Sequence, residues 1–376
     1  MHLALVGAFP FPFPQGSQVF FTGQARSLQA AGARVTGVCY GRGVGPVPAD
    51  LRLVRTRFAP RKLLSGPSLA KPFADAALAT AIVRAHRRDP FDAVLAHNAE
   101  AALAALLARP RVRRPVVYVA HTILAEELAT YAAPRWESVL SALGARIDAF
   151  IARRADAIVA LSRAGEAALA PHARGPVVRI PPGLAPGPSP APDAIASACR
   201  RHGLLPGGFA LYAGNLDGYQ DLPMLAAAAA RAKTPIVVAT HTDGTAPAPL
   251  VTVRATDADE VRTLTHGAAV ALLARRAAGG FPIKLLNYME ASRAIVARAS
   301  VADPLVHDRS GWILADDAPP AAWADAIDAL VADPSLAARL GAEARRTLER
   351  DHDPAVLARR LLVWLATLPT RDRVAA

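Results

Sequence analysis

The sequence predicts an α/β fold of two doubly wound, Rossmann-like domains that face a central cleft. Short apolar runs alternate with alanine-rich helical segments, a pattern typical of parallel β-α-β units with right-handed crossovers. A stretch rich in proline and glycine, residues 181–193, interrupts the alternation and predicts a domain boundary. The alternation then starts again, so the carboxyl ends of two parallel sheets are expected to line the cleft.

The first domain is expected to contain six buried strands. They are the short apolar runs at residues 3–8, 33–40, 92–97, 115–121, 156–162 and 176–183. Helical patterns separate many of them, notably at residues 17–31, 74–88, 99–109 and 136–154.

The second domain is expected to contain five strands. They cover residues 209–216, 235–241, 250–255, 269–274 and 293–299. The last helical pattern, residues 355–368, is strongly apolar on one face, so it is predicted to pack against a core.

Composition limits the class of protein. Hydrophobic residues make up 52% of the 376 residues, which is ample for the cores of two or three domains. Only Cys39 and Cys199 occur, so a disulfide framework is excluded and a reducing compartment is expected. No apolar run reaches the roughly 18 residues that cross a bilayer, and the first residues lack a basic leader. We expect a cytoplasmic protein, at most peripheral on the inner membrane face.

The basic excess lies in the first half of the chain. Residues 1–185 contain 23 Lys and Arg against 11 Asp and Glu, whereas residues 186–376 contain 20 of each. This asymmetry favours an anionic partner, such as a membrane surface, an acidic acceptor or nucleic acid, although arginines on solvated faces would produce it too. The densest segment, residues 52–88, mixes basic and apolar side chains as anionic lipid surfaces require. They are Arg52, Arg55, Arg57, Arg61, Lys62, Lys71, Arg84, Arg87 and Arg88, with Leu63, Leu64, Leu69 and Phe73 among them and Asp75 as the acidic residue.

Two histidines follow neighbouring strands of the first domain. His97 and His121 each stand at the carboxyl end of a predicted strand, which is the side where open parallel sheets bind ligands. Both are therefore expected to point into one place, with a structural role as the alternative. The polar residues nearby are Asn98, Glu100, Thr122, Glu126 and Glu127.

A loop enters a helix after the first strand. Gly16 and Ser17 stand at this junction, and Ser17 is the predicted N-cap. Phe9, Phe11 and Phe13 precede it, where they either close the top of the sheet or line the approach of a ligand.

The second domain contains a candidate phosphate site. The sequence GGFPIKLLNYMEASRAIVA, residues 279–297, places Lys284 where a glycine-rich loop enters a helix. A helix N-terminus offers unpaired backbone N–H groups and the positive end of the helix dipole, to which a lysine adds charge. The chain has only 4 lysines among its 43 basic residues, which favours a specific role over an ordinary solvated side chain. Gly214 and Asn215 follow the first strand of this domain, where a glycine permits close backbone approach to a ligand.

The same segment resembles the donor-binding signature of the family 4 glycosyltransferases, E-G-F-G-x-x-x-x-E-A-M-A-x-G-x-P-V-V-A, which have the GT-B fold. Aligned on Phe281, Met289 and Val296, the chain has Gly279 and Asn287 at the positions of the two family glutamates. The resemblance implies that the first glutamate approaches the donor sugar and the second holds the ribose hydroxyls. Asn287 can still hydrogen-bond there, with a neutral amide in place of a carboxylate.

The resemblance assigns roles to the two halves of the chain. It implies that residues 1–182 form the domain that binds the acceptor and that residues 183–353 form the domain that binds the nucleotide-sugar. The helix at about 354–376 is expected to pack back on the first domain. The family's arginine and lysine on the diphosphate correspond to Asn215 and Gln220, so Lys284 is expected to supply the charge. His121 and Lys284 are the predicted catalytic residues. The predicted donor-binding residues are Gly16, Gly214, Asn215, Gly280, Phe281, Pro282, Ile283 and Asn287, and the predicted acceptor-binding residues are Ser17, His97, Asn98, Glu100 and Thr122.

We therefore expect a retaining glycosyltransferase that moves a sugar from a UDP- or GDP-sugar to a hydroxyl of a lipid-linked or cell-envelope acceptor. The donor is a co-substrate, and no cofactor or metal is expected because no D-x-D motif stands at a strand end. Zinc, P-loop and serine-hydrolase motifs are also absent from the sequence. Two alternatives remain open, a GT-B nucleotide-sugar epimerase and a non-enzymatic protein that binds anionic surfaces. No RNA-binding motif occurs, so nucleic acid is not an expected partner.

Overall fold

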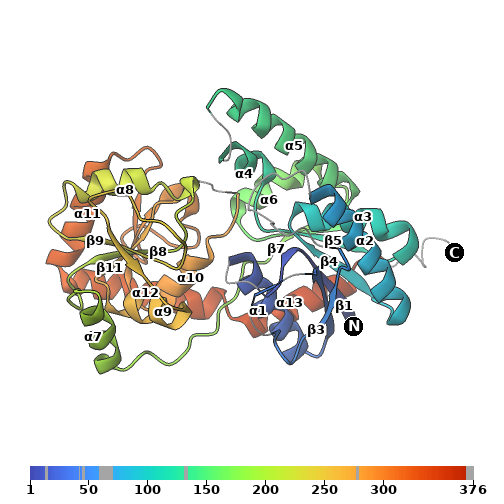
Figure 1. Ribbon diagram of the computed structural model, residues 1–376, viewed down its shortest axis with the longest axis horizontal. Helices are drawn as coiled ribbons and strands as arrows, with labels where there is room; N and C mark the ends of the chain where they lie inside the picture. The colour runs from blue at the N-terminus through green and yellow to red at the C-terminus, as the bar shows by residue number, and fades with distance from the viewer. Residues whose placement is uncertain are drawn as a thin grey trace. The chain divides into compact units, whose positions relative to one another are not determined.

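The computed structural model describes residues 1–12, 16–41, 43–44, 47–58, 71–130, 134–276 and 279–369. The chain divides into two units. Unit 1 comprises Met1–Gly183, Gly279–Phe281 and Pro354–Ala376, and unit 2 comprises Leu184–Ala278 and Pro282–Asp353. Each unit is a parallel sheet with helices packed on it (Figure 1). No described helix is both long and apolar enough to span a membrane.

The sheet of unit 1 has seven parallel strands in the order β3-β2-β1-β4-β5-β6-β7. Their bounds are β1 His2–Pro10, β2 Arg34–Tyr40, β3 Arg52–Arg55, β4 Ala93–His97, β5 Val116–Ala120, β6 Ala157–Ala160 and β7 Val177–Arg179. The helices of this unit are α1 Gly16–Ala30, α2 Lys71–Arg88, α3 Ala99–Val112, α4 Leu124–Thr130, α5 Glu137–Arg154, α6 Arg163–Leu169 and α13 Pro354–Ala366.

The sheet of unit 2 has six parallel strands in the order β10-β9-β8-β11-β12-β13. Their bounds are β8 Ala210–Ala213, β9 Ile236–Thr240, β10 Val251–Arg254, β11 Val270–Leu273, β12 Ala294–Arg298 and β13 Trp312–Leu314. The helices are α7 Pro192–Arg201, α8 Leu222–Ala229, α9 Ala258–Gly267, α10 Ile283–Glu290, α11 Pro320–Ala332 and α12 Pro334–Asp351.

Both sheets reverse their direction of winding once. In unit 1 the reversal lies between β1 and β4, and in unit 2 between β8 and β11. Open parallel sheets bind ligands at such a reversal, outside the carboxyl ends of the strands. The topology therefore gives each unit one candidate edge for a site.

All eleven predicted strands form, and the two-domain α/β prediction is confirmed. Two further strands, β3 and β13, were not predicted. Each is a short edge strand whose residues are half-buried or exposed: β3 has an arginine at both ends, and the apolar run of β13 is only three residues long. Strand β3 lies in the basic segment, where the sequence indicated only a charged surface.

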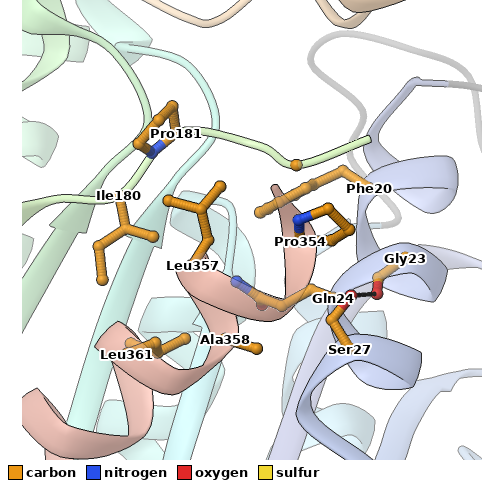
Figure 2. Close-up of a pocket in the computed structure, with 11 residues that line it drawn as sticks. Phe20, Gly23, Gln24, Ser27, Ile180, Pro181, Pro354, Leu357, Ala358 and Leu361 are labelled. Carbon is orange, nitrogen blue, oxygen red and sulfur yellow. Dashed lines mark hydrogen bonds between the residues drawn. The ribbon is translucent and has the colours of Figure 1, made fainter. Parts of the chain in front are cut away.

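Helices α1 and α13 of unit 1 pack side by side although more than 300 residues separate them. Figure 2 shows the small cavity between them, which is lined by Phe20 and Gln24 of α1, by Leu357 and Leu361 of α13 and by the segment that includes Ile180 and Pro181. Its volume is about 30 Å³, which holds a water molecule but no sugar. This cavity is a gap in the packing of the two helices and not a substrate site.

Candidate functional site

In unit 1 two histidines meet beside the reversal of the sheet. His97 is the last residue of β4, and His121 follows β5, which is paired with β4. The Nδ1 atom of His97 lies 2.8 Å from the Nε2 atom of His121, so the two rings share a hydrogen bond. The predicted convergence of the two side chains is thus observed, in the form of a direct contact.

The histidine pair is enclosed by aromatic rings. Phe20 lies 5.1 Å from the ring of His121 and Phe21 lies 5.0 Å from the ring of His97, centroid to centroid. His97 is fully buried, whereas His121 keeps 7% of its surface exposed. Only His121 therefore reaches solvent, and His97 lies behind it.

Burial sets the charge of both rings. Burial lowers the pKa of His121 to about 3, and it holds the pKa of His97 well below the ordinary histidine value, with a further lowering from His121. Both imidazoles are therefore neutral at neutral pH. The pair can accept or donate hydrogen bonds there, but it brings no positive charge.

This burial predicts that acid destabilises the protein. In the unfolded chain His121 takes up a proton near pH 6.5, whereas in the folded chain it does so only near pH 3. The unfolded state thus binds more protons between these values, and stability is full above pH 6.5 and falls below it, by at most about 1.4 kcal/mol per pH unit for one histidine. The free energy of unfolding is measured in urea for the wild type and for His121→Asn at pH 7.5 and 5.5. It should decrease less between these two pH values in the variant than in the wild type. An equal loss in both would mean that His121 is solvated in the folded state.

The aromatic residues after the first strand belong to the core. Phe9 and Phe11 are buried, and each packs against Phe21, with centroid distances of 5.4 and 5.2 Å. Of the two alternatives from the sequence, these contacts favour closure of the sheet. Phe13 lies outside the described residues.

The other predicted residues of unit 1 surround the strand ends. Helix α1 begins at Gly16, so the predicted N-cap role of Ser17 was wrong, since Ser17 lies within the first turn. Asn98 precedes α3 with a positive φ of 74°, and its side-chain oxygen is buried with no hydrogen-bond partner among the described residues. Glu100 forms an ion pair with Lys71 at 2.9 Å.

Thr122 is held by a neighbouring acid. Its hydroxyl donates to the carboxylate of Glu127 at 2.5 Å. Thr122 directly follows His121, and Glu127 lies in α4, the helix after β5. Thr122 is thus close to the predicted catalytic residue in the chain and in the fold.

Gly279 stands at the position of the first glutamate of the family signature, and a steric restriction explains why this residue is a glycine. Gly279 clusters with unit 1, where its N–H donates to the Glu126 carboxylate at 2.7 Å and its carbonyl accepts from the Ser162 hydroxyl at 3.4 Å. A Cβ atom at this position would lie 2.6 Å from the Cγ1 atom of Ile123, closer than real atoms approach. No larger side chain fits here, and the nearest carboxylate comes from Glu126.

In unit 2 a hydrogen-bonded cluster forms at the carboxyl ends of β8 and β11. The Lys284 ammonium donates to the Gln220 side chain at 3.0 Å, and Gln220 donates to Asn215 at 2.8 Å. The same ammonium lies 3.9 Å from the centroid of the Tyr212 ring. The residues around this lysine therefore all come from one segment, residues 212–220, which lies more than 60 positions before Lys284 in the sequence.

The surroundings of Lys284 favour the binding of an anion. Burial and the nearby Arg275 guanidinium hold its pKa well below the ordinary lysine value, and the Asp217 carboxylate only partly opposes them. The lysine stands in the first turn of α10, whose N-cap is Pro282 and whose N-terminus has no capping side chain among the described residues. A helix N-terminus with a lysine in its first turn is an arrangement that binds phosphate.

The remaining predicted donor residues lie along the same loop and helix. Gly280 and Phe281 are buried, Ile283 opens α10, and Asn287 is exposed one turn after Lys284. Gly280 and Phe281 cluster with unit 1, whereas Ile283 and Asn287 belong to unit 2.

Two arginines after β11 were missed by the sequence reasoning. The Arg275 guanidinium lies 5.3 Å from the centroid of the Tyr219 ring. Arg276 and the buried Arg298 both donate to the Asp221 carboxylate, at 2.8 and 2.6 Å. The available signal was the sequence LLARR, in which two cations directly follow a buried strand at the binding edge of the sheet.

Two family models match the chain. Glycosyltransferase Family 4 matches residues 14–186, and Glycosyl transferases group 1 matches residues 211–333. The chain belongs to the group 1 glycosyltransferases of family 4. This finding confirms the predicted family and the prediction of an enzyme. Among curated proteins, none matches the sequence.

Solved structures of similar fold match this glycosyltransferase over nearly its whole length. Sucrose-phosphate synthase from Thermosynechococcus elongatus is 16% identical with a TM-score of 0.83, and the match covers 98% of each chain. HepE from Anabaena, in complex with UDP and glucose, is 15% identical with a TM-score of 0.74 and covers 98% of this chain and 100% of its own. WaaG, a glycosyltransferase involved in lipopolysaccharide biosynthesis, is 16% identical with a TM-score of 0.67 and covers 97% and 100%. These likenesses confirm the GT-B fold of the two units.

Gly214 offers a test of the cluster in this glycosyltransferase. Its φ of 148° is strained for other residues, and an added Cβ atom would lie 2.6 Å from Nζ of Lys284. We expect Gly214→Ala to destabilise the protein by about 1–3 kcal/mol and to displace the lysine, because backbone strain of this kind costs that much. Gly218→Ala is the matched control, since nothing lies within 4 Å of its added Cβ. Urea unfolding measures both, and equal stability of the two variants would contradict the prediction.

Proposed function

We propose that this glycosyltransferase binds a nucleoside-diphosphate sugar in unit 2 and retains the configuration of the transferred sugar. The observation that carries the proposal is the Lys284 cluster at the reversal of the sheet, beside the uncapped N-terminus of α10. A departing diphosphate develops negative charge, which a fixed ammonium and helix N–H groups stabilise. The family's usual cations are replaced by Asn215 and Gln220. Gln220 accepts a hydrogen bond from the Lys284 ammonium and donates one to Asn215.

The proposed donor is a UDP- or GDP-sugar. HepE, which has the same fold, was solved with UDP-glucose and with UDP and glucose, which supports UDP as the first candidate. Asn287 stands one turn after Lys284 with its side chain exposed, so its amide can hydrogen-bond the ribose. The proposed reaction needs no metal or cofactor, because the cations and dipole of unit 2 meet the charge of the leaving group.

Unit 1 is proposed to bind the acceptor. His121 presents a neutral imidazole at the strand ends, with Thr122, Asn98 and Ser17 nearby in the fold. In this scheme the acceptor hydroxyl attacks from the face that the diphosphate leaves, so no protein nucleophile is required. His97 is proposed to act on the acceptor side through its hydrogen bond to His121, because it is itself fully buried.

A lipid-linked or cell-envelope acceptor at the inner membrane face fits the charge of unit 1. WaaG, described as acting in lipopolysaccharide biosynthesis, shares the fold. In residues 52–88, Arg57, Arg87 and Arg88 are exposed, and Phe73 exposes 70% of its surface. Other cations of the segment are engaged, since Arg52 pairs with Asp89 and Lys71 with Glu100. Residues 59–70, which include Arg61, Lys62, Leu63, Leu64 and Leu69, lie outside the described residues.

A thermal-shift screen tests the donor. UDP, GDP, ADP and their sugars are added separately, and a nucleotide that binds only the folded protein raises Tm in proportion to RT ln(1 + [L]/Kd). We expect one nucleoside diphosphate to give the largest increase in Tm, and the corresponding nucleotide-sugar to give an increase of similar size. No shift with any nucleotide would contradict the proposal. The preferred donor is then incubated without acceptor, where release of an epimerised sugar nucleotide would identify an epimerase instead.

The stereochemistry needs a separate measurement. The anomeric configuration of the product, read by NMR from the coupling of the anomeric proton, should equal that of the donor. An inverted product would rule out the retaining scheme and would leave the donor assignment standing.

A further inference from the structure

Helix α5 of unit 1 and its N-cap residue, Trp136, expose a row of large apolar side chains. Trp136, Val139, Leu143 and Phe150 expose 53%, 53%, 46% and 42% of their surfaces. Their spacings of 3, 4 and 7 residues place them along one side of the helix. A soluble surface carries single apolar residues without consequence, but a continuous row of this size marks an interaction surface.

The opposite side of α5 is fixed to the protein. Helices α4 and α5 lie side by side (Figure 1). A Cβ atom at Gly144 would lie 2.5 Å from the carbonyl of Leu124, and the buried Asp148 carboxylate accepts from the Ala125 N–H at 3.0 Å. The apolar row therefore points outward because the inner side of the helix is held by α4.

Arginines flank the row. Arg135, Arg146, Arg153 and Arg154 are exposed, and Glu137 is the one exposed acid of residues 135–154. The Arg154 guanidinium stacks on the Phe150 ring at 4.9 Å, so cation and apolar surface are continuous. Within the part of the chain that the structure describes, no ion pair joins Arg146 or Arg153 to an acid. The surface is both apolar and positively charged.

We propose that the outer face of α5, formed by Trp136, Val139, Leu143, Phe150 and the flanking arginines, lies on an anionic lipid bilayer. A helix with an apolar face and arginines beside it rests in the interface, with its apolar side chains among the lipid tails and its cations at the headgroups. Tryptophan favours this depth because its ring is apolar and its N–H is polar.

A second copy of the chain fits the outer face of α5 less well than an anionic bilayer does. A two-fold symmetric contact through this face would set the four arginines of one copy against those of the other, with one glutamate in each to offset them. An anionic bilayer meets the apolar row and the positive charge at once. The inference rests on the proposed membrane contact of unit 1 and places its apolar part on α5.

The test uses the full-length enzyme and two vesicle types, phosphatidylcholine alone and phosphatidylcholine mixed with phosphatidylglycerol. We expect co-sedimentation with the mixed vesicles only, decreasing with added salt because salt screens exposed charges. The double variant Leu143→Gln, Phe150→Gln should bind at least tenfold more weakly. Leu205→Gln is the matched control, because Leu205 exposes 77% of its surface in unit 2.

A spectroscopic readout reports the position of the helix directly. Brominated lipids should quench the fluorescence of Trp136 on binding, and this part of the quenching should vanish in Trp136→Phe, which leaves the other three tryptophans in place. Equal quenching in wild type and Trp136→Phe would overturn the proposal. The proposal would also be overturned if the Leu143→Gln, Phe150→Gln variant bound the mixed vesicles as well as the wild type does. It would be overturned too if the double variant Arg87→Glu, Arg88→Glu lost binding while the Gln variant still bound.

Two further outcomes separate this inference from the proposed transferase. A wild-type dimer in light scattering that the Gln variant abolishes would overturn the bilayer in favour of a second copy. Failure to bind either vesicle would also overturn it. In both cases the nucleotide-dependent Tm shift would remain, because the Lys284 cluster lies in unit 2.

Discussion

His121→Ala should lose most of its transfer activity, by about 10²-fold or more in kcat, while it keeps its affinity for the nucleotide. The imidazole stands at the strand ends of unit 1 as the less buried member of the histidine pair, where it is proposed to contact the reacting sugar. A contact made in the transition state acts on kcat, and the loss of one polar group that stabilises developing charge costs about that factor. Steady-state kinetics with the preferred donor gives kcat, and nucleotide titration gives Kd.

The control is His172→Ala, because His172 is exposed and lies away from the strand ends in the turn after α6. Its kinetics should equal those of the wild type. If His121→Ala also turned over normally, the pair would be a structural element of the core. A parallel loss of kcat and of nucleotide affinity would indicate that the variant disturbs the whole fold.

Lys284→Ala should weaken the binding of the nucleoside diphosphate by about 1.5–3 kcal/mol, the contribution of a hydrogen bond to a charged group. In terms of Kd this is roughly a factor of 10 to 150. The free protein should be little affected, because the lysine bonds only to Gln220 and stacks on Tyr212 in the described structure. Calorimetric titration of wild type and variant with UDP or GDP measures the difference.

Lys233→Ala is the matched control for this variant. Lys233 is exposed and precedes β9, at the end of the sheet opposite to the Lys284 cluster. It removes the same charge from the same unit, so it tests general electrostatic attraction. Equal weakening in both variants, or none in Lys284→Ala, would remove Lys284 from the diphosphate site.

The sequence predicted the central strands because they are continuous apolar runs, as a parallel sheet covered on both faces requires. The edge strands were not predicted, because β3 has an arginine at both ends and β13 is only three residues long. The meeting of His97 and His121 was predictable from topology alone, since the carboxyl ends of neighbouring parallel strands adjoin. Their direct hydrogen bond was not, because it depends on side-chain rotamers and on the packing of Phe20 and Phe21.

Contacts between distant segments also escaped prediction. The reason for Gly279 lies in the shape of Ile123, more than 150 positions earlier in the chain. The cluster of unit 2 likewise brings together Gln220 and Lys284, which the strands β9, β10 and β11 separate in the sequence. Arg275 was visible in the sequence, but its importance depends on its approach to Tyr219, which no local pattern indicates.

The bond between the two histidines also has a direction. Nε2 of His97 is buried and, within the described residues, has no hydrogen-bond partner. A bare lone pair there is less costly than an orphaned N–H, so the proton of His97 belongs on Nδ1, from which it donates to Nε2 of His121. His121 must then carry its own proton on Nδ1. The ring of His97 thereby selects the tautomer of His121. At every pH where both rings remain neutral, His121 offers an uncharged N–H donor to an oxygen at the strand ends.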